Sequence, residues 1–526
     1  MSRVFALPLV LAAAAIFAGC DDRDGFWDKD AQISQAVGLT DTVAVLDPNA
    51  ERVLLVTAQA DQRSQVTTLP LGKNLATAQA SADRTSLLVL TRGVLDRRRA
   101  TDEAPALTIL GGGAAAGVRR SYPLTEPLSG LSVDPLGTFV TVFAATSDAG
   151  YVQNPNELLV TRVQEPASAT NPAPVTIRSF GSRPQRLSYT PSLGLPGGNH
   201  RLLLVETSNA LGIVDLEDLK KPDITVRLSS SGGDATPAAV AYTDGDPANG
   251  TDARLAVRLA AGQNVVLLDF VPQTDGTSPH AFRPFPNLVD VGGAATDIRF
   301  VRTDGGLRLA ALVPSKQSLV LVDPATSTTT PVALNATYDR ISLISEAVNN
   351  GDGADVALVW STSAATIAIV ALGTSVGTPY RSIDTLQLQE SLSAVLDVPA
   401  PNQRLKLLVG SSGRRFFVLD LEKRTAAPLE ASLGSRIATT DDGERATLSA
   451  NGQSRLAVID LVSVHPRNLN LERPIRDLFD IQRTDGGRAL VAVHDVGGGG
   501  LTLLDGKSPD LGSSREVHGL LLEGKK

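Results

Sequence analysis

Few residues of this chain have side chains and spacing suited to chemistry. The 526 residues include one cysteine, Cys20, and five histidines, which are His200, His280, His465, His494 and His518. The histidines lack the spacing of metal ligands, and a single thiol cannot form a disulfide within the chain. The sequence contains no Gly-x-Ser-x-Gly motif, phosphate-binding loop or dinucleotide fingerprint. It therefore gives no positive indication of catalysis, although remote residues of a folded chain can still converge.

Two turn-like segments carry the hard oxygen ligands that calcium prefers. Their carboxylate and amide residues are Asp244, Asp246 and Asp252 in the first segment and Asn350, Asp352 and Asp355 in the second. The second segment resembles the calcium loops of FG-GAP propeller repeats, and that resemblance implies a calcium ion that stiffens a turn. The alternative is a pair of solvated hairpin turns, in which Asp, Asn and Gly are frequent for backbone reasons. We expect no other cofactor.

Cys20 stands at the end of an apolar stretch, residues 4–18, that is too short to span a bilayer as a stable helix. The ending Phe-Ala-Gly-Cys resembles the lipobox of bacterial lipoproteins, in which small residues precede a cysteine that accepts a diacylglycerol. The phenylalanine departs from the usual leucine. The resemblance implies a cleaved signal peptide over residues 1–19, a lipidated Cys20, and a tether over residues 20–40. The alternative is an ordinary secretory signal with an incidental cysteine.

Lipidation would hold the protein in the bacterial cell envelope, because several acyl chains on one residue anchor a protein durably in a membrane. Asp21 and Asp22 follow the cysteine. In enterobacterial lipoproteins, aspartate at this place resembles the signal for retention at the inner membrane, but other bacteria do not follow that rule. We therefore expect an anchor in either the inner or the outer membrane.

The composition predicts a large folded body after the tether. Hydrophobic residues make up 42% of the chain and charged residues 20%, with 46 glycines and 31 prolines for turns. Aromatic residues make up only 4%, so the core must consist of Val, Leu, Ile and Ala, which favours β-structure. The net charge of -8 argues against a nucleic-acid partner, because phosphate binding needs a positive surface.

A short apolar strand that ends in aspartate recurs along the chain. These closing aspartates are Asp215, Asp269, Asp323, Asp420, Asp460 and Asp505. They lie 40 to 54 residues apart except for one interval of 97 residues, in which the apolar run 366–372 fills the missing place. Two further strands precede each copy, often joined by Asp-Gly, which favours a hairpin because glycine permits a positive φ. We interpret the closing aspartates as turn residues that bind the following backbone amides, and not as catalytic residues.

Repeats of this length with four short strands each are typical of a β-propeller. The pattern resembles the YVTN and quinoprotein-like propeller repeats over residues 40–522. We count nine or ten units, so either some units pair within one blade, or the ring is unusually large, or the chain forms two smaller domains. We predict an all-β fold, a propeller of about eight four-stranded blades over residues 41–526. The alternatives are two smaller β domains or a pair of β-sandwiches.

A run of three arginines, Arg97, Arg98 and Arg99, is the most basic part of this acidic chain. It could bind an anionic glycan, a lipid headgroup or an acidic protein. We favour a simpler interpretation, a solvated loop between two strands.

Two classes of function remain. The favoured hypothesis is a membrane-anchored envelope lipoprotein whose propeller is a scaffold for a protein or polysaccharide partner. The alternative is an enzyme centred on the propeller channel, either a calcium-dependent lactonase-like hydrolase or a quinone-dependent dehydrogenase, for which fold analogy is the only support.

Overall fold

The computed structural model of this chain describes residues 31–58, 64–145, 148, 150–163, 174–178, 180–230, 233–245, 252–274, 276, 278–344, 354–374, 381–496 and 498–522. These residues form ten four-stranded antiparallel sheets, the blades of a β-propeller, and two short hairpins. The chain divides into two compact units, one of residues 128–471 and one of the residues before and after them. No helix of the described residues is long and apolar enough to cross a membrane.

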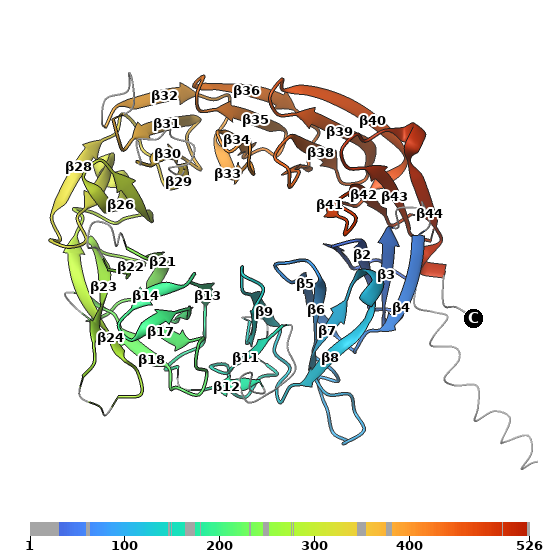
Figure 1. Cartoon of the computed structure of the whole chain (residues 1–526), viewed down its shortest axis with the longest axis horizontal. Helices are drawn as coiled ribbons and strands as arrows, with labels where there is room; N and C mark the ends of the chain where they lie inside the picture. Colours follow the sequence, from blue (N-terminus) through green and yellow to red (C-terminus); the bar gives the residue numbers. More distant parts are fainter. Residues whose placement is uncertain are drawn as a thin grey trace, which may run out of the picture. The chain divides into compact units, whose positions relative to one another are not determined.

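The unit that holds both chain ends contains three blades (Figure 1). Their strands are β1 (Gln35–Leu39), β2 (Thr42–Asp47), β3 (Arg52–Ala58) and β4 (Ser64–Pro70); β5 (Leu75–Ala80), β6 (Ser86–Thr91), β7 (Ala106–Gly111) and β8 (Gly117–Pro123); and β41 (Asp477–Gln482), β42 (Arg488–His494), β43 (Gly500–Asp505) and β44 (Arg515–His518). The short 3-10 helices of this unit are η1 (Gly113–Ala115), η6 (Leu511–Ser513) and η7 (Leu520–Leu522).

The unit of residues 128–471 contains seven consecutive blades. The first three are β9 (Gly130–Val133), β10 (Phe139–Phe143), β11 (Leu158–Arg162) and β12 (Val175–Ile177); β13 (Arg186–Tyr189), β16 (Leu202–Glu206), β17 (Ala210–Asp215) and β18 (Ile224–Arg227); and β21 (Pro237–Thr243), β22 (Arg254–Leu259), β23 (Asn264–Pro272) and β24 (Phe282–Asp290). The next two are β25 (Asp297–Thr303), β26 (Gly306–Val313), β27 (Ser318–Val322) and β28 (Thr329–Ala333); and β29 (Arg340–Ile344), β30 (Val356–Trp360), β31 (Thr366–Ala371) and β32 (Ile383–Gln387).

The last two blades of this unit carry the pocket discussed below. They are β33 (Leu392–Asp397), β34 (Leu405–Gly410), β35 (Arg415–Asp420) and β36 (Thr425–Glu430); and β37 (Ser435–Thr439), β38 (Arg445–Ala450), β39 (Gln453–Asp460) and β40 (His465–Ile475). Between the blade strands lie the hairpins β14 (Leu193–Leu195) with β15 (Gly198–His200) and β19 (Ser229–Ser230) with β20 (Gly233–Asp234), and the 3-10 helix η4 (Pro314–Lys316).

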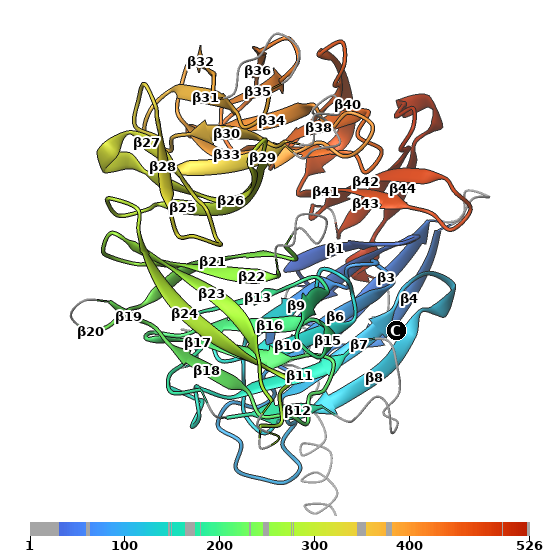
Figure 2. The same ribbon diagram turned by 60° about the vertical axis from the view of Figure 1, so that its left-hand side comes forward.

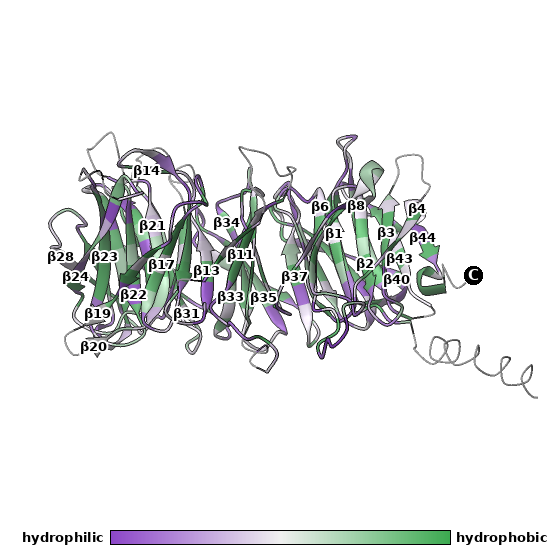
Figure 3. Cartoon of the chain, turned by 90° about the horizontal axis from the view of Figure 1, so that it is seen from below, coloured by the Kyte–Doolittle hydropathy of each residue, from purple (hydrophilic) through white to green (hydrophobic). Residues whose placement is uncertain are grey.

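Within each unit, neighbouring blades pack against each other through their faces, which explains the continuous apolar runs of the middle strands. In the first blade, Val43 and Val45 of β2 face β41–β44, while Ala44 and Leu46 face β5–β8. Successive side chains of a strand point to opposite faces, so a strand buried on both sides cannot alternate with polar residues. All six residues of β2 are buried accordingly. Figure 2 shows the twist of these stacked sheets, and Figure 3 shows the hydrophobic residues along the strands and many hydrophilic residues in the connections.

The hairpins predicted from Asp-Gly pairs are confirmed. Asp304 and Gly305 form the turn between β25 and β26, where Thr303 pairs with Gly306. Gly306 has a φ of +92°, a region that glycine enters at no steric cost. The apolar run without a closing aspartate is also a strand, β31, in the third position of its blade.

The all-β fold and the four-stranded blades are confirmed, but the predicted count of about eight is wrong: the described residues contain ten blades. Shared blades were one explanation of the nine or ten units, and an unusually large ring was another. In the described residues, each unit supplies all four strands of its own sheet. The first blade starts with β1 (Gln35–Leu39), ahead of the boundary at residue 41 that the sequence suggested.

Candidate functional site

Three of the six predicted calcium ligands lie in the described residues, and two of these have a structural use. The buried carboxylate of Asp355 accepts a hydrogen bond from the backbone N–H of Arg302 at 2.6 Å, and the Asp355 N–H donates to the Arg302 carbonyl at 2.9 Å. These bonds join the end of β25 to the segment before β30. Asp244 accepts from the N–H of Gly194 at 2.6 Å, which ties the end of β21 to β14.

The three described residues, Asp244, Asp252 and Asp355, are not grouped as a metal site. Asp252 is exposed just before β22. Asp246, Asn350 and Asp352, like the predicted lipidation site Cys20, lie outside the described residues. Within the described residues, no group of three His, Cys, Asp or Glu side chains could hold a metal ion. The calcium loops stay a prediction.

Among the histidines, His200 comes nearest to a reactive arrangement. Its Nδ1 donates to the carboxylate of Asp215 at 3.0 Å, and Lys221 Nζ lies 3.5 Å from the same oxygen. Asp215 is the closing aspartate of its blade, and the other oxygen accepts from the N–H of Glu217. Phe282 packs edge-on against the His200 ring at 5.2 Å. His200, Lys221 and the N–H of Glu217 thus all contact the buried carboxylate of Asp215, which gives it a structural role.

Five of the six closing aspartates behave as turn residues, as predicted. Asp420 accepts from the backbone N–H groups of Glu422 and Lys423, each at 3.1 Å. Four other closing aspartates accept from an amide two residues later: Asp215, Asp323, Asp460 and Asp505. Asp269 differs, because it forms an ion pair with Arg254 of the neighbouring strand. The arrangement gives these carboxylates a structural role.

The arginine run lies on an exposed loop between β6 and β7, as predicted. The backbone N–H groups of Arg98 and Arg99 donate to the Asp102 carboxylate at 2.9 and 2.8 Å. Hydrogen bonds from Arg99 and Arg98 lower the pKa of Asp102 below its ordinary value. The loop thus fixes its backbone with one of its own acids and leaves Arg97, Arg98 and Arg99 exposed to solvent.

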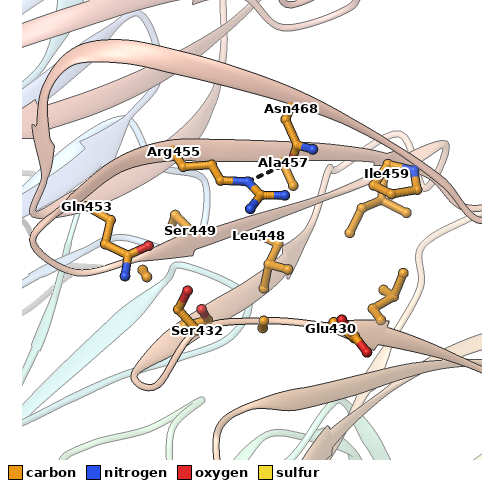
Figure 4. A pocket seen from close by; sticks show the side chains of 14 residues that line it. Glu430, Ser432, Leu448, Ser449, Gln453, Arg455, Ala457, Ile459 and Asn468 are labelled. Carbon is orange, nitrogen blue, oxygen red and sulfur yellow. Dashed lines mark hydrogen bonds between the residues drawn. The ribbon is translucent and has the colours of Figure 1, made fainter.

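A pocket of about 280 Å³ opens between the blades β33–β36 and β37–β40 (Figure 4). Its floor is apolar and buried, and comes from both blades: Leu429, Leu448, Ala457 and Ile459. Its rim is polar and includes Glu430, Ser432, Ser449, Gln453, Arg455 and Asn468. The volume lies just below the usual range for small-molecule sites, about 300–1,000 Å³, so the pocket fits a compact ligand.

A small side chain creates this pocket. The residue three places before the closing aspartate faces the preceding blade, and Val266, Val320 and Phe417 occupy that position in other blades. In β39 the position holds Ala457. Gly212 is smaller still, but there the Phe180 ring fills the space, 2.4 Å from where a Cβ would lie. No such ring covers Ala457, because the residues that line the pocket include no aromatic side chain.

Sequence reasoning missed every residue of this pocket. The one available signal was Ala457 in a position that carries larger side chains in most repeats. That signal is ambiguous by itself, because the Gly212 case shows that a distant residue can fill the gap. The pocket therefore becomes visible only in the packed blades.

Comparison with known proteins gives coarse likeness in fold alone. No family model matches the chain, and no curated protein matches it in sequence. Among solved structures, it is similar to dihydro-heme d1 dehydrogenase NirN in complex with DHE, with a TM-score of 0.43 and 15% identity over 70% of this chain and 72% of that chain. It is also similar to apo AztD from Citrobacter koseri, with a TM-score of 0.35 and 13% identity over 74% of this chain and 96% of that chain. For the Dos1 propeller the TM-score is 0.41, with 15% identity over 71% and 91%. Matches at this level say nothing about what this chain does.

Proposed function

We propose that this chain is a membrane-anchored envelope lipoprotein whose β-propeller is a binding scaffold for a protein or polysaccharide. The observation that carries the proposal is the pocket between β33–β36 and β37–β40, whose rim groups have few partners in the protein. Arg455 Nε donates to Asn468 Oδ1 at 3.0 Å, and the rim has no other side-chain hydrogen bond within the described residues. Polar groups around an apolar floor are typical of a ligand site.

The structural use of the ionisable residues also supports a scaffold. Five closing aspartates bind turn amides, Asp355 joins two blades, and His494 donates from Nδ1 to the Pro474 carbonyl at 2.7 Å.

The anchor is tested by metabolic labelling with an alkyne fatty acid, followed by membrane fractionation. The proposal expects the natural chain to be labelled and membrane-bound, and Cys20→Ser to be unlabelled and released from the membrane. An unlabelled natural chain would overturn the anchor.

The scaffold role is tested by affinity capture of the full chain from lightly cross-linked membranes, with mass spectrometry of proteins and glycans. The proposal expects a partner that is enriched with the natural chain and lost when the pocket is changed by Arg455→Gln and Glu430→Gln together. A partner that the double variant retains would place the binding surface elsewhere on the blades. Calcium-dependent turnover of a lactone by the purified protein would contradict the scaffold role.

A further inference from the structure

We propose that the pocket between β36 and β39 binds a short apolar peptide in its free zwitterionic form, with its carboxylate at Arg455 and its ammonium group at Glu430. The inference rests on the proposed binding role of this pocket. It does not depend on the anchor, on Cys20 or on a macromolecular partner. Its chemistry follows from three features of the pocket: the donors on one wall, the carboxylate on the other, and the apolar floor between them.

The wall formed by β39 and β40 offers hydrogen-bond donors to an anion. Arg455 uses only Nε within the described residues, so both terminal guanidinium nitrogens are available. Asn468 receives that bond on Oδ1, which leaves its amide NH₂ free to donate to a ligand. A guanidinium with two free N–H groups matches a carboxylate in a bidentate pair, a stronger contact than a neutral hydrogen bond.

The opposite wall ends in a carboxylate that has no hydrogen-bond or ion-pair partner among the described residues. Glu430 is the last residue of β36 and is exposed at the rim. Figure 4 shows Glu430 and Arg455 on opposite sides of the pocket, with Leu448 between them in this view. A ligand that uses both groups carries a positive charge at one end, a negative charge at the other, and an apolar part in the middle.

A short peptide meets these requirements better than a single amino acid or a sugar. In an α-amino acid the ammonium and carboxylate groups share one carbon, whereas each added residue separates them by about 3.5 Å. The amide groups of a peptide can also bond Ser449 and Gln453 at the rim. The lining contains no aromatic ring on which the apolar face of a sugar could stack.

The expected affinity is modest because the rim is exposed and the pocket is small. For a dipeptide of about fourteen non-hydrogen atoms, the efficiency typical of drug-sized ligands gives a Kd on the order of 0.1–1 mM. Isothermal titration calorimetry of the purified full chain with Ala-Leu measures this range. The matched probes are N-acetyl-Ala-Leu, which lacks the ammonium group, Ala-Leu amide, which lacks the carboxylate, free leucine, and N-acetylglucosamine.

The proposal expects Ala-Leu to bind and each blocked peptide to bind at least about tenfold more weakly. Arg455→Gln should weaken Ala-Leu about tenfold and leave Ala-Leu amide unchanged, since that probe has no carboxylate to lose. Ala457→Leu should abolish binding by filling the floor. Arg467→Gln is the matched control: Arg467 lies between two lining residues of β40, so its side chain points away from the pocket, and the variant should bind as the natural chain does.

Three results would overturn the proposal. They are no binding of Ala-Leu at 10 mM by protein shown to be folded, equal binding of Ala-Leu and its amide, and binding that Arg455→Gln leaves unchanged. Tighter binding of leucine or N-acetylglucosamine than of the dipeptide would show that the pocket binds an amino acid or a sugar and not a short peptide. If Ala457→Leu fails to fold, the exposed variants Arg455→Gln and Glu430→Gln still decide the result.

Discussion

Asp460 shows how a single carboxylate defines a turn of this fold. One of its oxygens accepts from the backbone N–H of Val462 at 3.1 Å, and from the N–H and hydroxyl of Ser463 at 2.7 and 2.8 Å. The hydrogen bonds from Ser463 lower the pKa of Asp460 below its ordinary value of 3.8. Because the folded state favours the ionised form, the carboxylate stabilises the fold at neutral pH and loses this effect as the pH falls below about 4.

Asp460→Ala should therefore lower the free energy of unfolding by about 1 kcal/mol at pH 7, the usual contribution of hydrogen bonds to an exposed turn. The difference from the natural chain should shrink as the pH falls below about 4, because the Asp460 carboxylate is then protonated. Urea denaturation at several pH values measures both effects. Asp96→Ala, which removes an exposed acid from the loop between β6 and β7, should change the stability by less than about 0.5 kcal/mol.

The folded state favours the neutral form of His494. It is buried in β42, where Nδ1 donates to the Pro474 carbonyl and Nε2 accepts from the Thr502 hydroxyl at 2.8 Å. Burial lowers the pKa of His494 below its ordinary value of 6.5, although the Pro474 carbonyl, Glu516 and Asp495 favour the charged form. The folded chain thus keeps this ring neutral in a pH range where the unfolded chain protonates it.

The free energy of unfolding should fall as the pH drops below about 6.5, until the ring is protonated in the folded state as well. His494→Gln should remove this part of the pH dependence and lower stability at pH 7, because glutamine cannot reproduce both hydrogen bonds. Chemical denaturation between pH 5 and pH 8 measures the slope. An unchanged slope in the variant would show that His494 is protonated equally in both states.

At the scale of the element, neighbouring blades are joined by side chains that reach the next blade. Tyr189 of β13 donates to the Ser132 carbonyl of β9 at 3.0 Å, and Arg186 donates to the Ala238 carbonyl of β21 at 2.8 Å. A third link is the ion pair between Arg201 and Asp134, whose side chains are mostly buried. These directional links fix the position of one sheet against the next. Apolar packing alone is not directional and fixes that position less closely.

Arg201→Met should destabilise the protein by about 3 kcal/mol, because it leaves the buried Asp134 without its cation. Asp134 keeps hydrogen bonds from the backbone N–H groups of Leu136 and Thr138, so the chain should still fold. Adding Asp134→Asn to Arg201→Met should recover part of the loss, since no unpaired charge then remains. Thermal denaturation of both variants measures the effect, and equal stability of the two would contradict it.

Local pattern predicted the strands and hairpins because the blades pair strands that follow one another in sequence, apart from β13 and β16, which the hairpin β14–β15 separates. The links between blades could not be predicted in this way. Arg201 and Asp134 are separated by 67 residues, and the sequence around neither residue indicates that the two form an ion pair. The pocket has the same origin: Ala457 leaves a gap, whereas the smaller Gly212 does not, because Phe180 fills the space beside it. Contacts of this kind depend on how finished sheets stack.

At the scale of the molecule, the first and last blades of the described residues pack together. Figure 1 shows β1–β4 beside β41–β44, and a shared apolar cluster joins them through residues such as Ile33, Leu54, Val491 and Leu521. Arg52 of β3 also donates to the carbonyl of Leu521. Both ends of the described chain are therefore part of the folded body.

Leu521→Ala should lower the free energy of unfolding by about 3 kcal/mol, because Leu521 is only 3% exposed and its removal leaves a cavity between the first and last blades. Leu522→Ala changes the next residue, which is 61% exposed, and should change stability by less than about 0.5 kcal/mol. Guanidinium denaturation distinguishes the two. Equal effects would show that the chain ends do not pack as described.

The packing of the first blade against the last has a consequence for the order in which the chain is made. A ribosome completes β1–β4 early, and β5–β8 follow at once to cover one apolar face of that blade. The other face, with Val43 and Val45, stays uncovered until residues 481–521 have been synthesised. An apolar surface exposed for this long favours aggregation until the blade β41–β44 covers it.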